Sequence, residues 1–108
     1  MINYHNKTFL SAGNTSNEES TFLFEQEGQI VSGTYNGGSV LFGHLLAITD
    51  DTGKLNIRYH HINTKGELIT GTCFSVPEVL PDGKLRLHQK WKNTSGTKSE
   101  GESIIEEA

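Results

Sequence analysis

Residues 54–60 read KLNIRYH and residues 84–91 read KLRLHQKW, and in both stretches a large or apolar side chain recurs at every second position. The recurring positions are Leu55, Ile57 and Tyr59 in the first stretch and Leu85, Leu87, Gln89 and Trp91 in the second. The residues between them are polar or charged. A period of two is typical of a β-strand with one dry and one wet face. The two stretches therefore predict strands of a half-buried sheet.

Glycine-rich turn signals separate such stretches along the chain. They are Glu27-Gly28, Asn36-Gly37-Gly38, Asp50-Asp51-Thr52-Gly53, Asn63-Thr64-Lys65-Gly66, Pro81-Asp82-Gly83 and Asn93-Thr94-Ser95-Gly96. Glycine supplies the positive φ that tight reversals need, so each cluster predicts a hairpin. The strands are expected over residues 7–12, 20–26, 29–35, 39–49, 54–62, 67–79, 84–92 and 99–106. Short connections join antiparallel neighbours. We therefore expect an all-β chain, one domain over residues 1–108 that forms an eight-stranded antiparallel up-and-down barrel.

Several glycines fall inside the expected strands instead of at turns. They are Gly33, Gly43, Gly71 and Gly101. A glycine weakens a strand unless the backbone bends sharply or approaches another group closely, and a small curved barrel gives a reason for both. Pro77 lacks a ladder donor, so its strand is expected to carry a bulge or to lie beside a gap.

Charge pairing predicts a register for the last two strands. In that register Lys90 lies opposite Glu100, His88 opposite Glu102 and Lys84 opposite Glu106, while Leu85 meets Ile105 on the other face. Opposite charges directly across an antiparallel pair are favourable, so charge pairing favours this alignment over its neighbours.

Composition limits the classes of partner. The net charge of −4 and the lack of a basic stripe argue against nucleic-acid or anionic-membrane binding. Cys73 is the only cysteine, which excludes an intrachain disulfide and a CxxC pair. Neither a signal peptide nor a membrane-spanning run is recognisable, so a soluble, cytoplasmic protein is expected.

Two segments resemble avidin and streptavidin, the biotin-binding barrels. The first is Ser20-Thr21-Phe22 followed by Gly33-Thr34-Tyr35, similar to the STF and GTY of that family. The second is Trp91 followed by Thr94-Ser95-Gly96-Thr97, similar to the family's tryptophan and TSGT hairpin. The resemblance implies that Ser20 and Tyr35 hydrogen-bond a ligand carbonyl and that Trp91 walls the pocket. A second family tryptophan would align near Ser103, so the aromatic box is incomplete, which argues against biotin.

The preferred interpretation is a small-molecule-binding barrel without catalytic residues, cofactor or metal. Beside Ser20, Tyr35 and Trp91, the lining is expected to include Tyr59, Thr70, Thr72 and Gln89. Hydroxyl donors fix the orientation of a ligand, and an aromatic ring provides an apolar surface for it to contact. The apolar outer surface of a small barrel also suits a homodimer or homotetramer, and a filled, self-assembling barrel is a further alternative.

An enzyme is the second alternative, because the whole chain also resembles small bacterial proteins that carry the automatic label N-acetylglutamate synthase. The label implies acetyl transfer from coenzyme A. The usual acetyltransferase fold receives the cofactor at a helix N-terminus, and no such helix is visible here. Arg58 and Arg86 could hold an acidic metabolite inside the barrel. The alternative for both arginines is an outward position, paired with Glu78, Glu100 or Glu102.

Other reactive side chains are given structural interpretations. His88 with Glu102, joined by His44 or His60, could form part of a metal or acid–base site, but a cross-strand polar pair is the favoured interpretation. Cys73 is expected to be a small buried hydrophobe and not a nucleophile.

Overall fold

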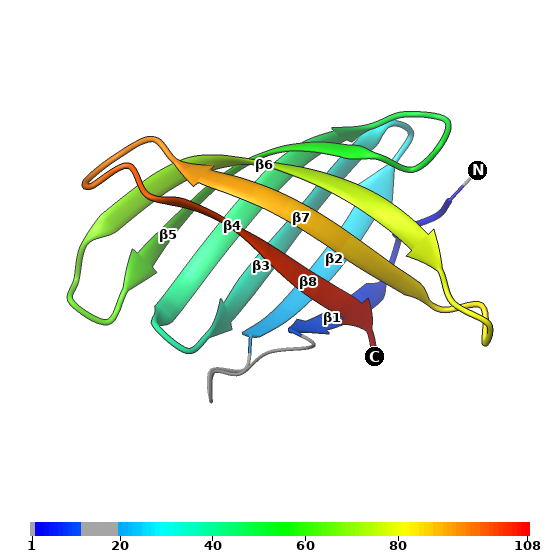
Figure 1. The fold of residues 1–108 in the computed structure, drawn as a ribbon, viewed down its shortest axis with the longest axis horizontal. Helices are drawn as coiled ribbons and strands as arrows, with labels where there is room; N and C mark the ends of the chain where they lie inside the picture. The colour runs from blue at the N-terminus through cyan, green and yellow to red at the C-terminus, as the bar shows by residue number, and fades with distance from the viewer. Residues whose placement is uncertain (1, 12–19) are drawn as a thin grey trace.

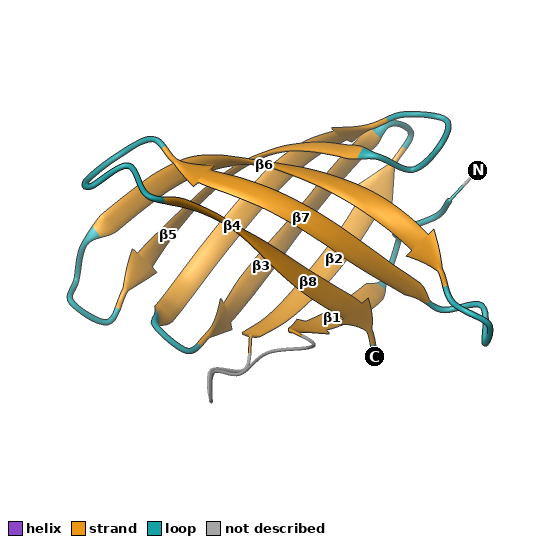
Figure 2. Ribbon diagram, in the orientation of Figure 1, coloured by secondary structure: helices purple, strands orange, loops and turns teal. Residues whose placement is uncertain are grey.

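The computed structural model describes residues 2–11 and 20–108, and these form a closed barrel of antiparallel strands (Figure 1). The strands are β1 (Lys7–Ser11), β2 (Ser20–Glu27), β3 (Ile30–Gly37), β4 (Val40–Thr49), β5 (Leu55–Asn63), β6 (Leu68–Val79), β7 (Leu85–Asn93) and β8 (Glu100–Glu107). The described residues hold only strands, turns and loops (Figure 2). No helix among them is long and apolar enough to span a bilayer.

Each strand pairs with the next along the chain, and β1 closes the barrel against β8. The closing pairs are Phe9 with Glu107, Leu10 with Glu106 and Ser11 with Ile105. The expected all-β barrel is confirmed, and the expected strand ends agree with the observed ones to within two residues. Ala12, the expected end of the first strand, lies outside the described residues.

The register predicted for β7 and β8 is wrong by two residues. Lys90 lies opposite Glu102 and not Glu100, and Leu87, not Leu85, meets Ile105. A slip of two keeps every side chain on its own face, so alternation cannot distinguish the two registers. The observed register still pairs opposite charges, with the Arg86 Nε 3.0 Å from Glu106 Oε2.

Pro77 lies beside a gap in the strand pairing, which is one of the two arrangements expected for it. It is opposite Leu87 in the β6–β7 ladder, while the β5–β6 ladder ends at Leu55 and Ser75. The proline therefore sits where β6 has run past the end of β5, and no ladder donor is lost on that side. The register shifts of the described sheet occur elsewhere, near Tyr35 in β3–β4 and near Phe42 in β4–β5.

One end of the barrel, which we call the plugged end, is closed by aromatic side chains. Tyr4, Phe9 and Phe24 are at most 1% exposed, and their ring centroids lie 5.0–6.3 Å apart. The Tyr4 hydroxyl donates to the carbonyl of Gly53, and the Tyr4 N–H donates to Gln26 Oε1 at 2.8 Å. These two hydrogen bonds hold the segment that precedes β1 across this end of the barrel.

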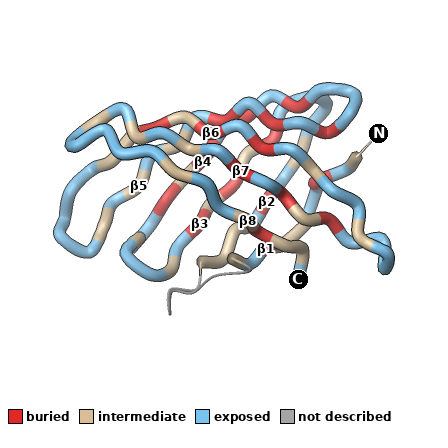
Figure 3. Tube along the Cα trace, in the orientation of Figure 1, coloured by how far each residue is buried: buried red, intermediate tan, exposed pale blue. Residues whose placement is uncertain are grey.

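Buried and exposed residues alternate along the strands, as Figure 3 shows for β6 and β7. The fully buried aliphatic side chains Val31, Leu55, Leu87 and Ile105 belong to the same core as the plug. The hairpins β3–β4, β5–β6 and β7–β8 gather at the other end, away from the N-terminus (Figure 1). We call that end the mouth.

Candidate functional site

A cavity of about 280 Å³ lies at the mouth of the barrel. Its described lining combines aromatic, aliphatic and small polar side chains: Phe22, Tyr35, Ser39, Val40, Leu45, Ile57, Tyr59, His61, Cys73, Gln89, Trp91, Asn93 and Ser103. Residues of seven strands, β2 to β8, therefore reach one space. This is possible because strands of a closed barrel all direct alternate side chains to a common axis.

The three largest rings of the mouth each lie over a glycine of the next strand. The register pairs are Tyr35 with Gly43, Tyr59 with Gly71 and Trp91 with Gly101. A Cβ added to these glycines would lie 2.4, 2.3 and 2.7 Å from the opposite ring. Any side chain at these positions would displace the opposite ring. The glycines therefore determine the positions of the three aromatic rings that line the cavity.

The same arrangement occurs once at the plugged end. Gly33 lies opposite Phe24, and a Cβ on it would be 3.0 Å from that ring and 2.6 Å from the Leu23 carbonyl oxygen. All four glycines that interrupt the strand pattern thus permit a close approach, which confirms one of the two expected reasons for them.

Tyrosine hydroxyls and polar partners form two hydrogen-bonded pairs at the mouth. The Tyr35 hydroxyl lies 2.8 Å from His61 Nδ1, and the Tyr59 hydroxyl donates to Asn93 Oδ1 at 2.5 Å. The His61 ring stacks on Tyr59 with an interplanar angle of 5° and meets Tyr35 edge-on. Phe22 also stacks on Tyr35, with centroids 5.2 Å apart. The rings are therefore held in place before any ligand arrives.

Burial keeps these groups uncharged. Desolvation raises the pKa of Tyr35 far above its ordinary value and that of Tyr59 to about 12. Burial, with the nearby His60, lowers the pKa of His61. The imidazole is consequently neutral at physiological pH, where tyrosine hydroxyls are protonated even at their ordinary pKa of about 10. If Tyr35 donates to Nδ1, the His61 proton is on Nε2.

The floor of the cavity carries a second polar network. Gln89 Nε2 donates to Ser75 Oγ at 3.0 Å, and the Ser103 hydroxyl donates to Gln89 Oε1 at 3.2 Å. Cys73 lies beside it, 3.8 Å from Ser75 Oγ, and burial raises the pKa of its thiol to about 11. A thiol with so high a pKa is a poor nucleophile, in agreement with the structural role expected for Cys73.

The permanently charged side chains considered at the sequence level lie outside this cavity. Arg86 bonds Glu106 and Glu78 on the outer wall, and Arg58 donates to Asn56 Oδ1 there. The described lining contains no Asp, Glu, Lys or Arg. The outward position of both arginines is thus confirmed. Of the expected acidic partners, Glu78 pairs with Arg86, whereas Arg58 bonds Asn56 instead of an acid. A carboxylate in the cavity would meet no guanidinium.

The suggested pairing of His88 with Glu102 is wrong. His88 Nε2 lies 2.8 Å from Glu78 Oε1 instead. In the observed register His88 is opposite Ile104, and Glu102 is opposite Lys90. The outer-face polar pair therefore exists with a different acid, across β6 and β7. Within the described residues no cluster of three or more His, Cys, Asp or Glu side chains is placed to hold a metal.

The structure brings four of the seven residues expected at the site together at the mouth. These are Tyr35, Tyr59, Gln89 and Trp91. Ser20 begins β2, half-buried, and is not among the lining residues, while its N–H donates to Ser11 Oγ. Thr70 and Thr72 alternate with the buried Gly71 and Cys73, so they lie on the outer wall, where Thr70 Oγ1 is 3.0 Å from Thr94 Oγ1.

Sequence reasoning omitted several lining residues, above all Phe22, His61 and Asn93. A signal for two of them was available, because His61 shares the face of Tyr59, two residues before it, and Asn93 shares that of Trp91. Phe22 belongs to the STF segment itself. Their mutual contacts, however, come from strands that are far apart in the sequence.

A closed up-and-down barrel that is packed at one end and hollow at the other belongs to the class of small barrels that hold one small ligand. This assignment rests on the wall geometry and on the aromatic lining of the mouth.

The chain belongs to the avidin-like family, because the model of that family, described as avidin-like protein, matches residues 2–108. The resemblance found in the STF, GTY and TSGT segments is thereby confirmed. The family and the fold together indicate small-molecule binding in general. Comparison with curated proteins and with solved structures found no match.

Proposed function

We propose that the mouth cavity binds one small, uncharged ligand that has a flat ring and a carbonyl or amide group. The observation that carries this proposal is the lining: aromatic walls and neutral hydrogen-bonding groups, with no acidic or basic side chain other than the neutral His61. A volume of about 280 Å³ is near the lower limit of ligand sites, so one or two rings fit.

The hydrogen-bonding groups of the mouth suit a ligand that both donates and accepts. Tyr35 and Tyr59 carry hydroxyl protons, and the carbonyl oxygen of Asn93 accepts. Because Tyr35 is already bonded to His61 and Tyr59 to Asn93, a ligand must replace these bonds with its own, and a compound without the matching groups gains nothing from them. The family resemblance assigns a ligand carbonyl to Tyr35 and Ser20, and for Ser20 this role stays a prediction.

Trp91 offers a direct test, since it is the only tryptophan of the chain and lines the cavity. Its fluorescence is titrated with biotin, cyclic ureas and amides, uncharged heteroaromatic compounds, glutamate and acetyl-coenzyme A. We expect an uncharged ring compound to change the emission and to raise the melting temperature. Tyr35→Phe should weaken that compound about tenfold, because one hydrogen bond is lost.

Thr72→Val is the matched control, because it removes a hydroxyl from the outer wall of the same barrel. Its affinity should equal that of the unchanged chain. Binding of glutamate or acetyl-coenzyme A, with no response to any uncharged compound, would contradict the proposal and favour the acyltransferase alternative. A loss of affinity in Thr72→Val equal to that in Tyr35→Phe would place the ligand elsewhere.

Self-association is a second proposed property, supported by the outer wall. Large apolar side chains on it are strongly exposed, among them Phe42, Leu46 and Ile48 of β4 and Phe74 of β6. Phe42, Leu46 and Ile48 share one face of β4, and exposed apolar surface of this kind is typical of protein interfaces. A homodimer or homotetramer is therefore expected, and light scattering of the purified protein measures it.

A further inference from the structure

Two histidines meet on the outer wall of the barrel, away from the mouth cavity. His44 of β4 and His60 of β5 are direct register partners, and their ring centroids lie 5.4 Å apart at an interplanar angle of 33°. Thr34 and Thr70 are their partners on the strands to either side. Strand pairing on both sides therefore fixes the backbone positions of the two histidines.

The ring nitrogens of this pair are available. Of the five histidines in the chain, the other three have ring partners: His5 Nδ1 accepts from the Gln26 N–H, His61 contacts Tyr35, and His88 contacts Glu78. Within residues 2–11 and 20–108, neither His44 nor His60 makes a side-chain hydrogen bond. Among the described residues, the two adjacent imidazoles therefore have ring nitrogens that are free to coordinate a metal ion.

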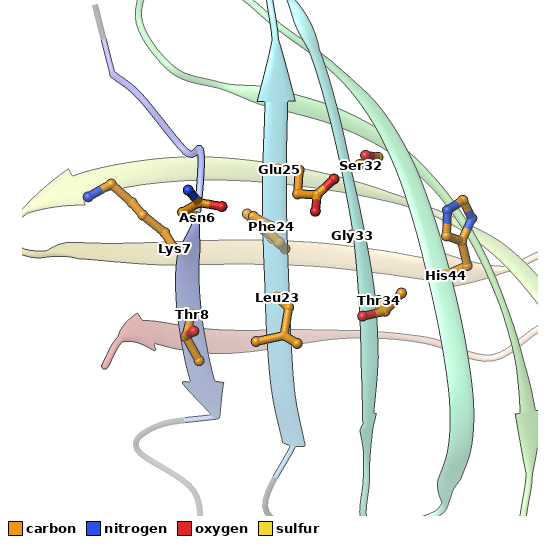
Figure 4. A pocket seen from close by; sticks show the side chains of 10 residues that line it. All are labelled: Asn6, Lys7, Thr8, Leu23, Phe24, Glu25, Ser32, Gly33, Thr34 and His44. Atoms are coloured by element: carbon orange, nitrogen blue, oxygen red, sulfur yellow. The ribbon is translucent and has the colours of Figure 1, made fainter.

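In a single copy of the barrel, solvent reaches both rings. His60 is exposed, and His44 is half-buried at the edge of a hollow of about 400 Å³ on the outside of β1 to β4 (Figure 4). Figure 4 shows the His44 ring standing off its strand, apart from Thr34 and Ser32. An ion in water therefore has a path to the pair.

The spacing of the rings matches joint coordination of one ion. A metal lies about 2.0–2.1 Å from an imidazole nitrogen, and hence about 3.2 Å from the ring centre. A tetrahedral angle between two such ligands puts the ring centres about 5.2 Å apart. The observed 5.4 Å agrees without movement of the strands. Either imidazole can rotate about its Cβ–Cγ bond to turn a ring nitrogen toward the ion. This rotation leaves the distance between the two ring centroids nearly unchanged.

We propose that His44 and His60 form a two-histidine site for a divalent transition-metal ion. Imidazole suits Zn²⁺, Ni²⁺ and Cu²⁺, whereas Mg²⁺ and Ca²⁺ require oxygen ligands. The remaining coordination positions are filled by water, since no third His, Cys, Asp or Glu of the described residues joins the pair. His61 cannot join it, because adjacent residues of a strand face opposite sides.

The neighbouring arginine on the same wall does not occupy the site. Arg58 precedes His60 by two positions, but its guanidinium donates to Asn56 Oδ1 and to the carbonyl of Ile57. These bonds direct it along β5 toward Asn56, away from the pair. Glu25 and Lys7 both line the hollow of His44. Lys7 Nζ is paired with Glu107 Oε2 at 3.1 Å, which offsets its charge, and the negative charge of Glu25 favours a cation there.

Calorimetric titration of the full chain with Zn²⁺ and Ni²⁺ at about pH 7.5, where free imidazole is neutral, tests the site. One ion per chain is expected. His44→Gln and His60→Gln should each weaken it about tenfold or more, because a single imidazole cannot chelate. His88→Gln and His5→Gln are matched controls, and neither should alter the affinity. NMR shifts of the His44 and His60 ring protons give an independent readout.

Binding that persists unchanged in the His44→Gln/His60→Gln double variant, with an unaltered melting temperature, would overturn the proposal. The absence of any binding to the unchanged chain would do the same. A loss in His5→Gln equal to that in His60→Gln would place the ion at the N-terminal segment and would also reject the site.

Discussion

The plugged end and the mouth are built from the same wall and the same device, an aromatic ring laid over a glycine. At the plugged end Phe24 over Gly33 packs against Tyr4 and Phe9, and all three rings are almost fully buried. At the mouth, Tyr35 over Gly43 and its counterparts surround a hollow. One barrel therefore separates stability from recognition by filling one end and leaving the other open.

The chemical difference between the two ends is equally informative. The plug uses hydrogen bonds to the backbone, as Tyr4 does with Gly53, and these have no role for a ligand. The mouth pairs side chain with side chain, as Tyr35 does with His61. Side-chain pairs can exchange partners when a ligand enters, whereas the plug contacts hold the chain together.

Replacement of Phe24, one of the rings of the plugged end, should cause the largest loss of stability. Phe24→Ala is expected to lower the free energy of unfolding by about 3–5 kcal/mol, because it leaves a cavity in a closed core. Phe22→Ala, at the half-buried mouth of the same strand, should cost less than half as much. Urea denaturation measures both. Equal losses would show that the mouth is packed as tightly as the plug.

A clash built into the mouth should have an intermediate effect. Gly43→Ala places a methyl group against the Tyr35 ring and is expected to cost about 1–3 kcal/mol of unfolding free energy. In a Tyr35→Ala background the same change should cost much less, because the obstacle is gone. The double-mutant cycle of the four proteins measures this coupling.

Gly28→Ala is the control for that cycle. Gly28 has a φ of 61° and open space around it, so its replacement strains only the local backbone. Its cost should not depend on Tyr35. Additive effects of Gly43→Ala and Tyr35→Ala would refute the view that the glycine positions the ring.

The smallest expected effect is a pH dependence confined to the mouth. Burial lowers the pKa of His61 below the ordinary 6.5, so the unfolded chain takes up a proton first as the pH falls. The stability that this group contributes is complete above about pH 6.5 and is lost as the pH falls through the folded-state pKa.

His61→Gln should therefore flatten the fall in melting temperature between about pH 7 and pH 5. Glutamine keeps an acceptor for Tyr35 without the titration. An unchanged pH profile in this variant would show that protonation of His61 is not resisted by the folded state.

Alternation and turn chemistry were enough to predict the number, order and approximate ends of the strands. They also predicted that Leu55 and Ile57 face inward and that Arg58 lies on the opposite face, because side-chain direction follows a period of two. The β7–β8 register was not predictable in this way, since a slip of two leaves each face intact and charges pair in either alignment.

The candidate site was predictable only in part for the same reason. Tyr59 and Trp91 follow from alternation, but Thr70 and Thr72 were assigned to the cavity although the buried Gly71 and Cys73 occupy that face. Because glycine gives no hydrophobic signal, the sequence does not show which residues of β6 face the interior. The aromatic ring that lies over each glycine would identify that face, but the ring belongs to the neighbouring strand.

By itself the sequence determined the barrel, its hairpins and its family, because these follow from local periodicity and short motifs. Only the tertiary structure decided which end is closed, which rings stand over glycines and that His44 meets His60. Those features depend on pairing between strands and on closure of β1 against β8. Such distances are fixed when the sheet curls on itself, and no local pattern encodes them.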